Sequence, residues 1–143
     1  MKSNKFDNLP PLGKEQALAM LDIPSQELAF SSDYYKAVFH LSKYPSKETE
    51  IALKRLLISR SNEQCFVIAR RKAVQVLADH GCIDAISLIG DCLQSDDPYL
   101  VENAAWALQK LKCKDIKLIN KIGSLLDNPN QNRRVLVQCL LRL

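Results

Sequence analysis

Residues 95–113, SDDPYLVENAAWALQKLKC, read as one helix with a sharp beginning. Asp97 is a favoured N-cap residue, and Pro98 is well tolerated as the first residue of a helix. Behind them, apolar residues recur at the spacing of a single helix face: Val101, Ala104, Ala105, Leu108 and Leu111. The small alanines in this stripe predict that another helix packs against it at close range.

The same outline returns at regular intervals along the chain. Shifted forward by 31 residues, Leu108 falls on Cys139, and shifted back by 31 it falls on Leu77. A further offset of 36 residues reaches Leu41. An internal period of this size predicts a repeat protein in which each unit packs on the next.

Breakers and capping residues divide the chain into an N-terminal extension and a repeat domain. Residues 1–31 form the extension, with one short helix at 14–21 that stops before Pro24. Residues 32–143 form the domain, about three and a half helix pairs, with helices at 32–43, 46–58, 63–79, 83–94, 98–111, 115–126 and 130–142. We name the first helix of each pair an A helix and the second a B helix. The predicted fold class is all-α, an α-solenoid of stacked antiparallel pairs.

Residues 97–108, DPYLVENAAWAL, resemble the HEAT-like repeat of the phycobilin lyases, in which an Asp-Pro start is followed by Val-Arg and then by closely spaced alanines and a leucine. This copy departs at Glu102, where arginine is usual. Residues 68–81, IARRKAVQVLADHG, and residues 128–140, NPNQNRRVLVQCL, are weaker copies. With residues 32–45, SDYYKAVFHLSKYP, they look like a cyanobacterial branch that includes proteins linked to phycobilisomes and a scaffold-like protein linked to iron–sulfur assembly. The resemblance carries over no catalytic residue, because the repeat consensus contains none.

The use of cysteine and the hydropathy pattern restrict the compartment. The five cysteines are Cys65, Cys82, Cys92, Cys113 and Cys139, and no two of them are spaced CxxC. The first thirteen residues are polar, and no apolar run approaches the ~20 residues of a membrane helix. We therefore expect reduced thiols in a cytoplasmic protein without a membrane span.

One regularity among the cysteines makes two of them weak ligand candidates. Cys82 and Cys113 lie 31 residues apart, and each stands two residues before an aspartate. They should occupy equivalent A-to-B turns, where they could hold a metal, an iron–sulfur cluster or a bilin. A packing role is favoured, since a cluster needs about four cysteines brought together. We predict no catalytic residue and no required cofactor, and we read both histidines as structural.

A nucleic-acid groove is not expected. Some HEAT-like proteins grip DNA along their B helices, which must then be basic. Here the lysines and arginines of the predicted B helices are matched by an equal number of carboxylates. Most of the positive charge behind the formal net charge of +4 lies on the A helices instead.

Two rows of equivalent positions run across the A helices. The first row alternates in charge, which predicts contacts between stacked repeats: Arg71, Glu102 and Arg133. The second row points away from the apolar stripe: Phe39, Gln75, Trp106 and Val137. The second row is either a protein-binding patch, with its aromatic and aliphatic members as contacts, or a surface that the N-terminal extension covers.

The predicted last helix carries an apolar face with no B helix after it: Val135, Leu136, Cys139, Leu140 and Leu143. Exposing four aliphatic side chains would forgo roughly 1.5–3 kcal/mol each, and a domain has only about 5–15 kcal/mol of total stability. We therefore expect a partner protein or a twin in a homodimer to cover this helix, with Leu136 and Leu140 as contacts. A fragment of a longer solenoid is the other explanation.

Three hypotheses about function stay open, and all of them rest on the resemblance. The lead hypothesis is a non-catalytic HEAT-repeat scaffold whose partner is a phycobiliprotein, a phycobilisome-related factor or a second HEAT-repeat chain. The alternative is a subunit of a bilin lyase or isomerase that is active only with a second chain. A further alternative is an iron–sulfur assembly scaffold. A binding protein is thus favoured over an enzyme.

Overall fold

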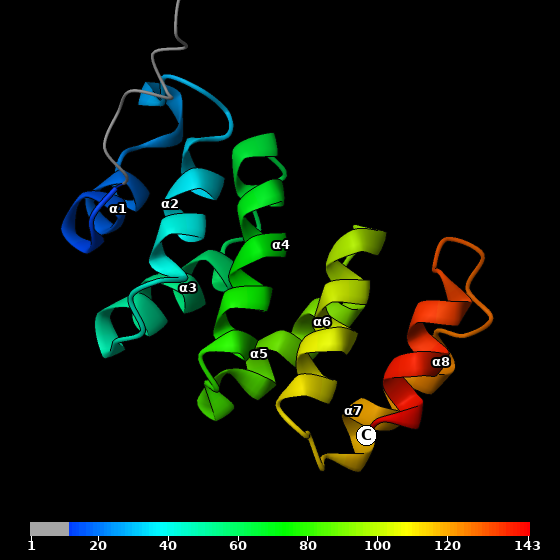
Figure 1. The fold of residues 1–143 in the computed structure, drawn as a ribbon. Helices are drawn as coiled ribbons and strands as arrows, with labels where there is room; N and C mark the ends of the chain where they lie inside the picture. Colours follow the sequence, from blue (N-terminus) through cyan, green and yellow to red (C-terminus); the bar gives the residue numbers. More distant parts are fainter. Residues whose placement is uncertain (1–11) are drawn as a thin grey trace, which may run out of the picture.

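The computed structural model describes residues 12–143, which contain helices and turns and no β-strand. The A helices are α2 (Asp33–Leu41), α4 (Gln64–Asp79), α6 (Pro98–Lys110) and α8 (Arg133–Leu141). The B helices are α3 (Lys47–Ile58), α5 (Ile86–Asp91) and α7 (Ile116–Ser124). The A helices lie side by side in chain order, and each contacts the next (Figure 1). The predicted all-α solenoid is thus confirmed.

Side-chain caps explain why the predicted bounds of several helices agree with the observed ones to within two residues. The side chain of Ser46 accepts a hydrogen bond from the backbone N–H of Thr49 at the start of α3. Asp97 and Asp115 cap α6 and α7 in the same manner. Each cap satisfies an N–H group that has no partner within the first turn, which fixes where the helix begins.

Four of the five residues of the predicted apolar stripe in α6 are buried, and the fifth, Leu111, is half-buried. Ala104 and Ala105 of α6 are fully buried, and so is Ala73 at the equivalent position of α4. Leu77 and Leu108 complete the seam between these two helices, each with no exposed surface. Because α4 and α6 meet through alanines flanked by leucines, their axes approach closely while the seam stays filled.

The second B helix departs from the prediction. Residues 83–94 are not one helix: the 3₁₀ turns η2 (Ile83–Ala85) and η3 (Cys92–Gln94) flank a short α5. Neither η2 nor α5 has an N-cap side chain that accepts a hydrogen bond, in contrast to α3 and α7. Tighter i→i+3 bonds at both ends satisfy the terminal backbone groups instead. Gly90 lies inside α5, where a Cβ atom would come within 2.6 Å of Leu118 in α7.

The last helix begins later than predicted. Residues 128–131 form a turn in which Asn128 accepts a hydrogen bond from the N–H of Asn130 through its side chain, at 2.9 Å. Its backbone oxygen accepts another from Gln131, at 3.0 Å. Asparagine side chains commonly stabilise such turns in competition with a helix. The cap of α8 is therefore Asn132, and the helix starts at Arg133 rather than at residue 130.

The short helix predicted at 14–21 is α1 (Lys14–Leu21), which packs against α2 and α3 at the N-terminal end of the stack. Ala17 is fully buried there, and the 3₁₀ turn η1 (Ser25–Glu27) leads on to α2. The first part of the predicted extension, residues 1–11, lies outside the described residues. Among residues 12–143, no helix combines the length and the apolar character that crossing a bilayer requires.

Candidate partner-binding surface

The four A helices share an outer face, which is the side opposite their buried stripe. We define this outer face by its equivalent and neighbouring positions: Phe39, Lys72, Gln75, Tyr99, Trp106, Arg134 and Val137. Phe39 is 44% exposed and Tyr99 is 61% exposed, whereas Trp106 and Val137 are half-buried. Residues 12–31 do not cover Phe39, because α1 packs on α2 and α3 and Phe30 is itself exposed.

Cations lie over the aromatic rings of this face. The Lys72 ammonium of α4 lies 5.6 Å from the ring centre of Phe39 in α2. Lys110 lies 5.0 Å from the ring centre of Trp106 within α6. These contacts are cation–π interactions, each contributing about 0.5–1 kcal/mol at exposed sites. They hold the rings in place while leaving part of each ring open to solvent.

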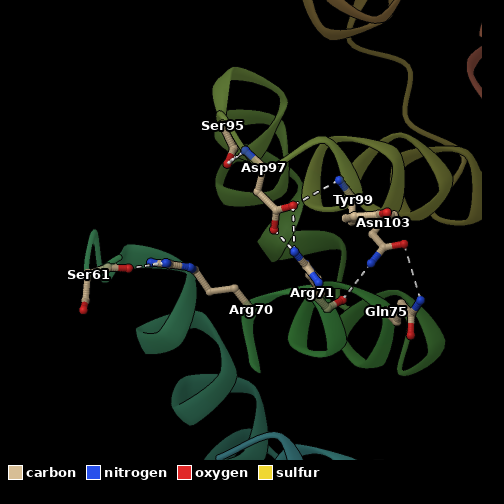
Figure 2. Close-up of polar contacts among 8 residues, drawn as sticks. All are labelled: Ser61, Arg70, Arg71, Gln75, Ser95, Asp97, Tyr99 and Asn103. Carbon is tan, nitrogen blue, oxygen red and sulfur yellow. Dashed lines mark hydrogen bonds and ion pairs between the residues drawn. The ribbon is translucent and has the colours of Figure 1, made fainter. Parts of the chain in front are cut away.

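A chain of polar contacts joins α4 to α6 and its N-terminal cap (Figure 2). The guanidinium of Arg71 donates two hydrogen bonds to the carboxylate of Asp97, at 2.8 and 3.0 Å. The amide of Asn103 donates to the backbone oxygen of Arg71 at 3.3 Å and accepts from Gln75 at 3.5 Å. Arg71 also lies 4.8 Å from the ring centre of Tyr99. Bidentate pairing fixes the direction of both partners, so this interface has one defined geometry.

The contacts between α6 and α8 are different, and they correct the predicted alternating row. Glu102 accepts a hydrogen bond from the backbone N–H of Asn132 at 2.9 Å. Arg133 bonds to Leu126 and Asp127 in the preceding loop, at 3.2 and 3.3 Å. No Arg71–Glu102 or Glu102–Arg133 contact forms among the described residues. Helical side chains lean toward the N-terminus, so Arg71 and Glu102 reach the cap of the next A helix rather than their equivalents.

The structure places the two weak ligand candidates in equivalent turns. Helices α4 and α6 both end in a Schellman motif: Cys82 donates its N–H to Leu77 at 3.0 Å, and Cys113 donates to Leu108 at 2.9 Å. The preceding residue in each turn has a positive φ, 69° at Gly81 and 56° at Lys112. Each cysteine therefore occupies the position where the motif favours an apolar contact, and Cys113 is buried.

Cys82, Cys92 and Cys139 are poor nucleophiles in this setting. Burial raises the pKa of the Cys82 and Cys139 thiols, and it raises the pKa of Cys92 to about 11. A thiol whose pKa is raised stays protonated at neutral pH. The protonated form is a weak nucleophile and a weak metal ligand. Among residues 12–143 no group of three or more His, Cys, Asp or Glu side chains is arranged to hold a metal ion.

A groove of about 520 Å³ lies on the other side of α4, between the loop 59–62, α5 with η3, and the start of α6. Its floor is the buried guanidinium of Arg70, which donates hydrogen bonds to the backbone oxygens of Ser59 and Ser61 (Figure 2 shows the Ser61 contact). Its walls combine apolar and polar side chains: Leu57, Leu88, Leu100, Arg60, Asn62 and Asp91. Within the described residues, the Arg60 and Asn62 side chains have no hydrogen-bond or ion-pair partner.

Sequence reasoning missed this groove. Arg70 follows the buried Ala69 within α4 and is itself only 9% exposed. An arginine next to a buried helix position was the one signal that the sequence offered. Buried arginine demands acceptors, and here the loop 59–62 wraps around it to provide them. The groove thus arises from a tertiary contact that helix periodicity does not reveal.

The C-terminal helix α8 is less open than predicted. Leu136 is fully buried and Cys139 is 5% exposed, because α8 packs against α6 and α7. The expectation that Leu136 faces a partner directly is therefore wrong, since neighbouring helices of the same chain cover it. Leu140 and Val137 remain half-buried, and Leu141 is 80% exposed.

The stacked helix pairs and the seams of alanine and leucine define an α-solenoid repeat protein. An Armadillo/beta-catenin-like repeat family matches residues 71–111, which run from α4 through α5 to the end of α6. No solved structure matches the chain.

Two curated proteins are similar to this chain over most of its length. The chain is 47% identical over 113 residues to the Bilin biosynthesis protein CpeY of Synechococcus sp. (strain WH8020), covering 78% of this chain and 27% of that protein. It is 34% identical over 139 residues to the Uncharacterized phycocyanin operon protein Y of Pseudanabaena tenuis (strain PCC 7409), covering 97% and 33%. The chain thus spans between a quarter and a third of the length of these relatives. It is a HEAT-like repeat protein related to cyanobacterial proteins of the phycobilin lyase superfamily.

Proposed function

We propose that the chain acts in phycobilin attachment, as the HEAT-repeat part of a bilin lyase or isomerase that works on a phycobiliprotein. The observation that carries this proposal is the 47% identity to a bilin biosynthesis protein over 78% of the chain. It favours the lyase hypothesis over the non-catalytic scaffold, and the setting of the proposal is the cytoplasm of a phycobilin-making cell.

The groove beside Arg70 has features that suit a bilin. A phycobilin is a linear tetrapyrrole with an apolar edge, pyrrole N–H groups and propionate carboxylates. Leu57, Leu88 and Leu100 offer apolar contacts, and Arg60 offers an unpaired cation for a propionate. The volume lies within the ~300–1,000 Å³ range of small-molecule sites. We assign bilin binding to this groove and protein binding to the outer face of the A helices.

The chain's own share of the reaction is binding and orientation. Its cysteines are buried or half-buried, and burial raises the pKa of Cys65, Cys82, Cys92 and Cys139. Holding the bilin beside the acceptor cysteine of the phycobiliprotein would accelerate attachment by proximity alone. A second HEAT-repeat chain would then supply the remaining contacts, as for a lyase active only as a pair.

The test is a bilin attachment assay. The chain, a phycobilin and an apo-phycobiliprotein subunit are incubated with and without a second HEAT-repeat chain, and covalent bilin is measured by fluorescence after denaturing electrophoresis. We expect attachment to depend on the chain, and Arg60→Glu to weaken bilin binding about tenfold. Lys117→Glu, the same charge change on α7 outside the groove, serves as the control.

The outcome also separates the remaining hypotheses. A stable complex with the phycobiliprotein, without bilin binding and without any effect on attachment, would support the scaffold hypothesis instead. The iron–sulfur hypothesis stays a prediction, and anaerobic incubation with ferrous iron and sulfide tests it. A visible absorption band and a higher melting temperature, both lost in Cys82→Ala, would support a cluster, since a ligand of the folded state stabilises that state.

A further inference from the structure

The charges of the outer face are not balanced within the chain. Three carboxylates border the outer face: Asp97 is paired with Arg71 at 2.8 Å and Asp79 with Lys110 at 2.5 Å, whereas Glu102 accepts only the backbone N–H of Asn132 at 2.9 Å. Lys72 and Arg134, in contrast, have no carboxylate partner among residues 12–143. Against one carboxylate without a cation, Glu102, the face carries Lys72 and Arg134 without a carboxylate, so the charge left unpaired among these residues is positive.

The unpaired cations lie next to exposed apolar surface. Lys72 lies over the ring of Phe39, which is 44% exposed, and Arg134 is three residues before Val137 on α8. Trp106 lies between them on α6, with Lys110 over its ring. A surface that alternates rings and cations fits a partner that alternates apolar side chains and carboxylates.

The middle of this face is already ordered before any partner arrives. The Arg71–Asp97 pair and the Asn103 contacts fix α4 relative to α6, and the ring contacts fix Phe39 and Trp106. A partner that binds here would order few side chains, so little of the interaction energy would be lost to entropy.

We propose that the outer face of α2, α4 and α6 docks an acidic amphipathic segment of a partner protein, with Lys72 and Phe39 as the main contacts. This inference deepens the proposed function by naming the chemistry of the partner's contact segment. Nucleic acid fits the face less well, because Lys72 and Arg134 are few cations for a phosphate backbone, whose binding commonly requires that several phosphates be neutralised.

The experiment uses peptide probes and the full chain, and it requires neither bilin nor a phycobiliprotein. One fluorescein-labelled amphipathic helical peptide carries glutamates beside a leucine stripe, and a second has glutamine at every glutamate position. A single-stranded DNA oligonucleotide is the third probe. Binding is measured by fluorescence anisotropy for the wild type, for Lys72→Glu, for Lys72→Gln and for the control Lys117→Glu.

We expect the glutamate peptide to bind about tenfold more tightly than the glutamine peptide, with the difference shrinking as salt rises. Lys72→Glu should weaken glutamate-peptide binding by about tenfold or more, Lys72→Gln by less, and Lys117→Glu by less than about twofold. Equal binding by the Lys72→Glu and Lys117→Glu variants would overturn the proposal, as would tighter binding of the oligonucleotide. Failure of the bilin assay leaves these results untouched, so the two proposals can fail separately.

Discussion

The α4–α6 and α6–α8 interfaces occupy equivalent places in the repeat, and they are built differently. At α4–α6, Arg71 forms a bidentate pair with the cap residue Asp97. At α6–α8, the equivalent residue is Glu102, which meets only the backbone N–H of the cap residue Asn132. The direction of the side chain is the same at both interfaces, although the charge is reversed.

The burial of equivalent core positions also differs between the two interfaces. Ala104 and Leu108 in the middle of the stack are fully buried, whereas Val135, at the position equivalent to Ala104, is half-buried. Equivalent positions in the repeats therefore share a geometry, but they are not equally buried. The middle of the stack is the more fully buried part, and two aromatic residues of the outer face, Tyr99 and Trp106, lie there on α6.

The largest difference between the two interfaces should appear on truncating their equivalent core residues. Leu108→Ala should lower the free energy of unfolding by about 2–5 kcal/mol, because the residue is fully buried among close-packed helices. Cys139→Ala, at the equivalent position of α8, should cost about 1 kcal/mol for the loss of one small apolar group. Urea denaturation measures both values, and equal costs would show that the ends are packed as tightly as the middle.

Helix positions and the buried stripe were accessible from the sequence because they depend on local chemistry. Caps such as Ser46, Asp97 and Asp115 and the period of the apolar residues determine them. The division of residues 83–94 was missed: neither η2 nor α5 has a capping side chain, and the helix period does not show where 3₁₀ bonds replace α-helical ones. The beginning of α8 was missed because the Asn128 turn competes with the helix.

The polar contacts and the groove were less predictable than the helices. The equivalence of Arg71, Glu102 and Arg133 was read correctly, but pairing between equivalent positions was wrong, since their side chains reach the adjacent cap or loop. The outer row containing Phe39 and Trp106 could be placed from the helix period alone. Whether that row binds a protein stays a prediction that the experiments above test.

A second, smaller difference concerns the caps. Asp97→Ala should cost about 2 kcal/mol, since it removes both a helix cap and the half-buried pair with Arg71. Asn132→Ala should cost about 1 kcal/mol, because only the cap is lost. A double-mutant cycle of Asp97→Ala with Arg71→Ala isolates the pair. A coupling energy near zero would mean that the pair adds no stability to the middle interface.

The smallest expected effect concerns the two equivalent turns. Lys112 adopts φ 56° where the earlier turn has Gly81 at φ 69°. A left-handed conformation costs a residue with a side chain about 1–2 kcal/mol. Glycine avoids this cost, but its greater conformational entropy in the unfolded state offsets part of the gain. Lys112→Gly should therefore raise the stability by about 0.5–1 kcal/mol, and Gly81→Ala should lower it by a similar amount. Thermal unfolding measures the stability of both variants. A lower melting temperature for Lys112→Gly would show that the backbone of Lys112 is not strained.

The most direct test of the central claim uses Trp106, the single tryptophan of the chain, as a probe of the outer face. The chain is labelled with fluorotryptophan and titrated with an apo-phycobiliprotein subunit, and the fluorine resonance is followed by NMR. If the middle of the stack presents a phycobiliprotein-binding face, the resonance shifts in a saturable manner, and Lys72→Glu weakens the titration whereas Lys117→Glu does not. A complex that forms, as shown by light scattering, while the Trp106 resonance stays unchanged would contradict the account.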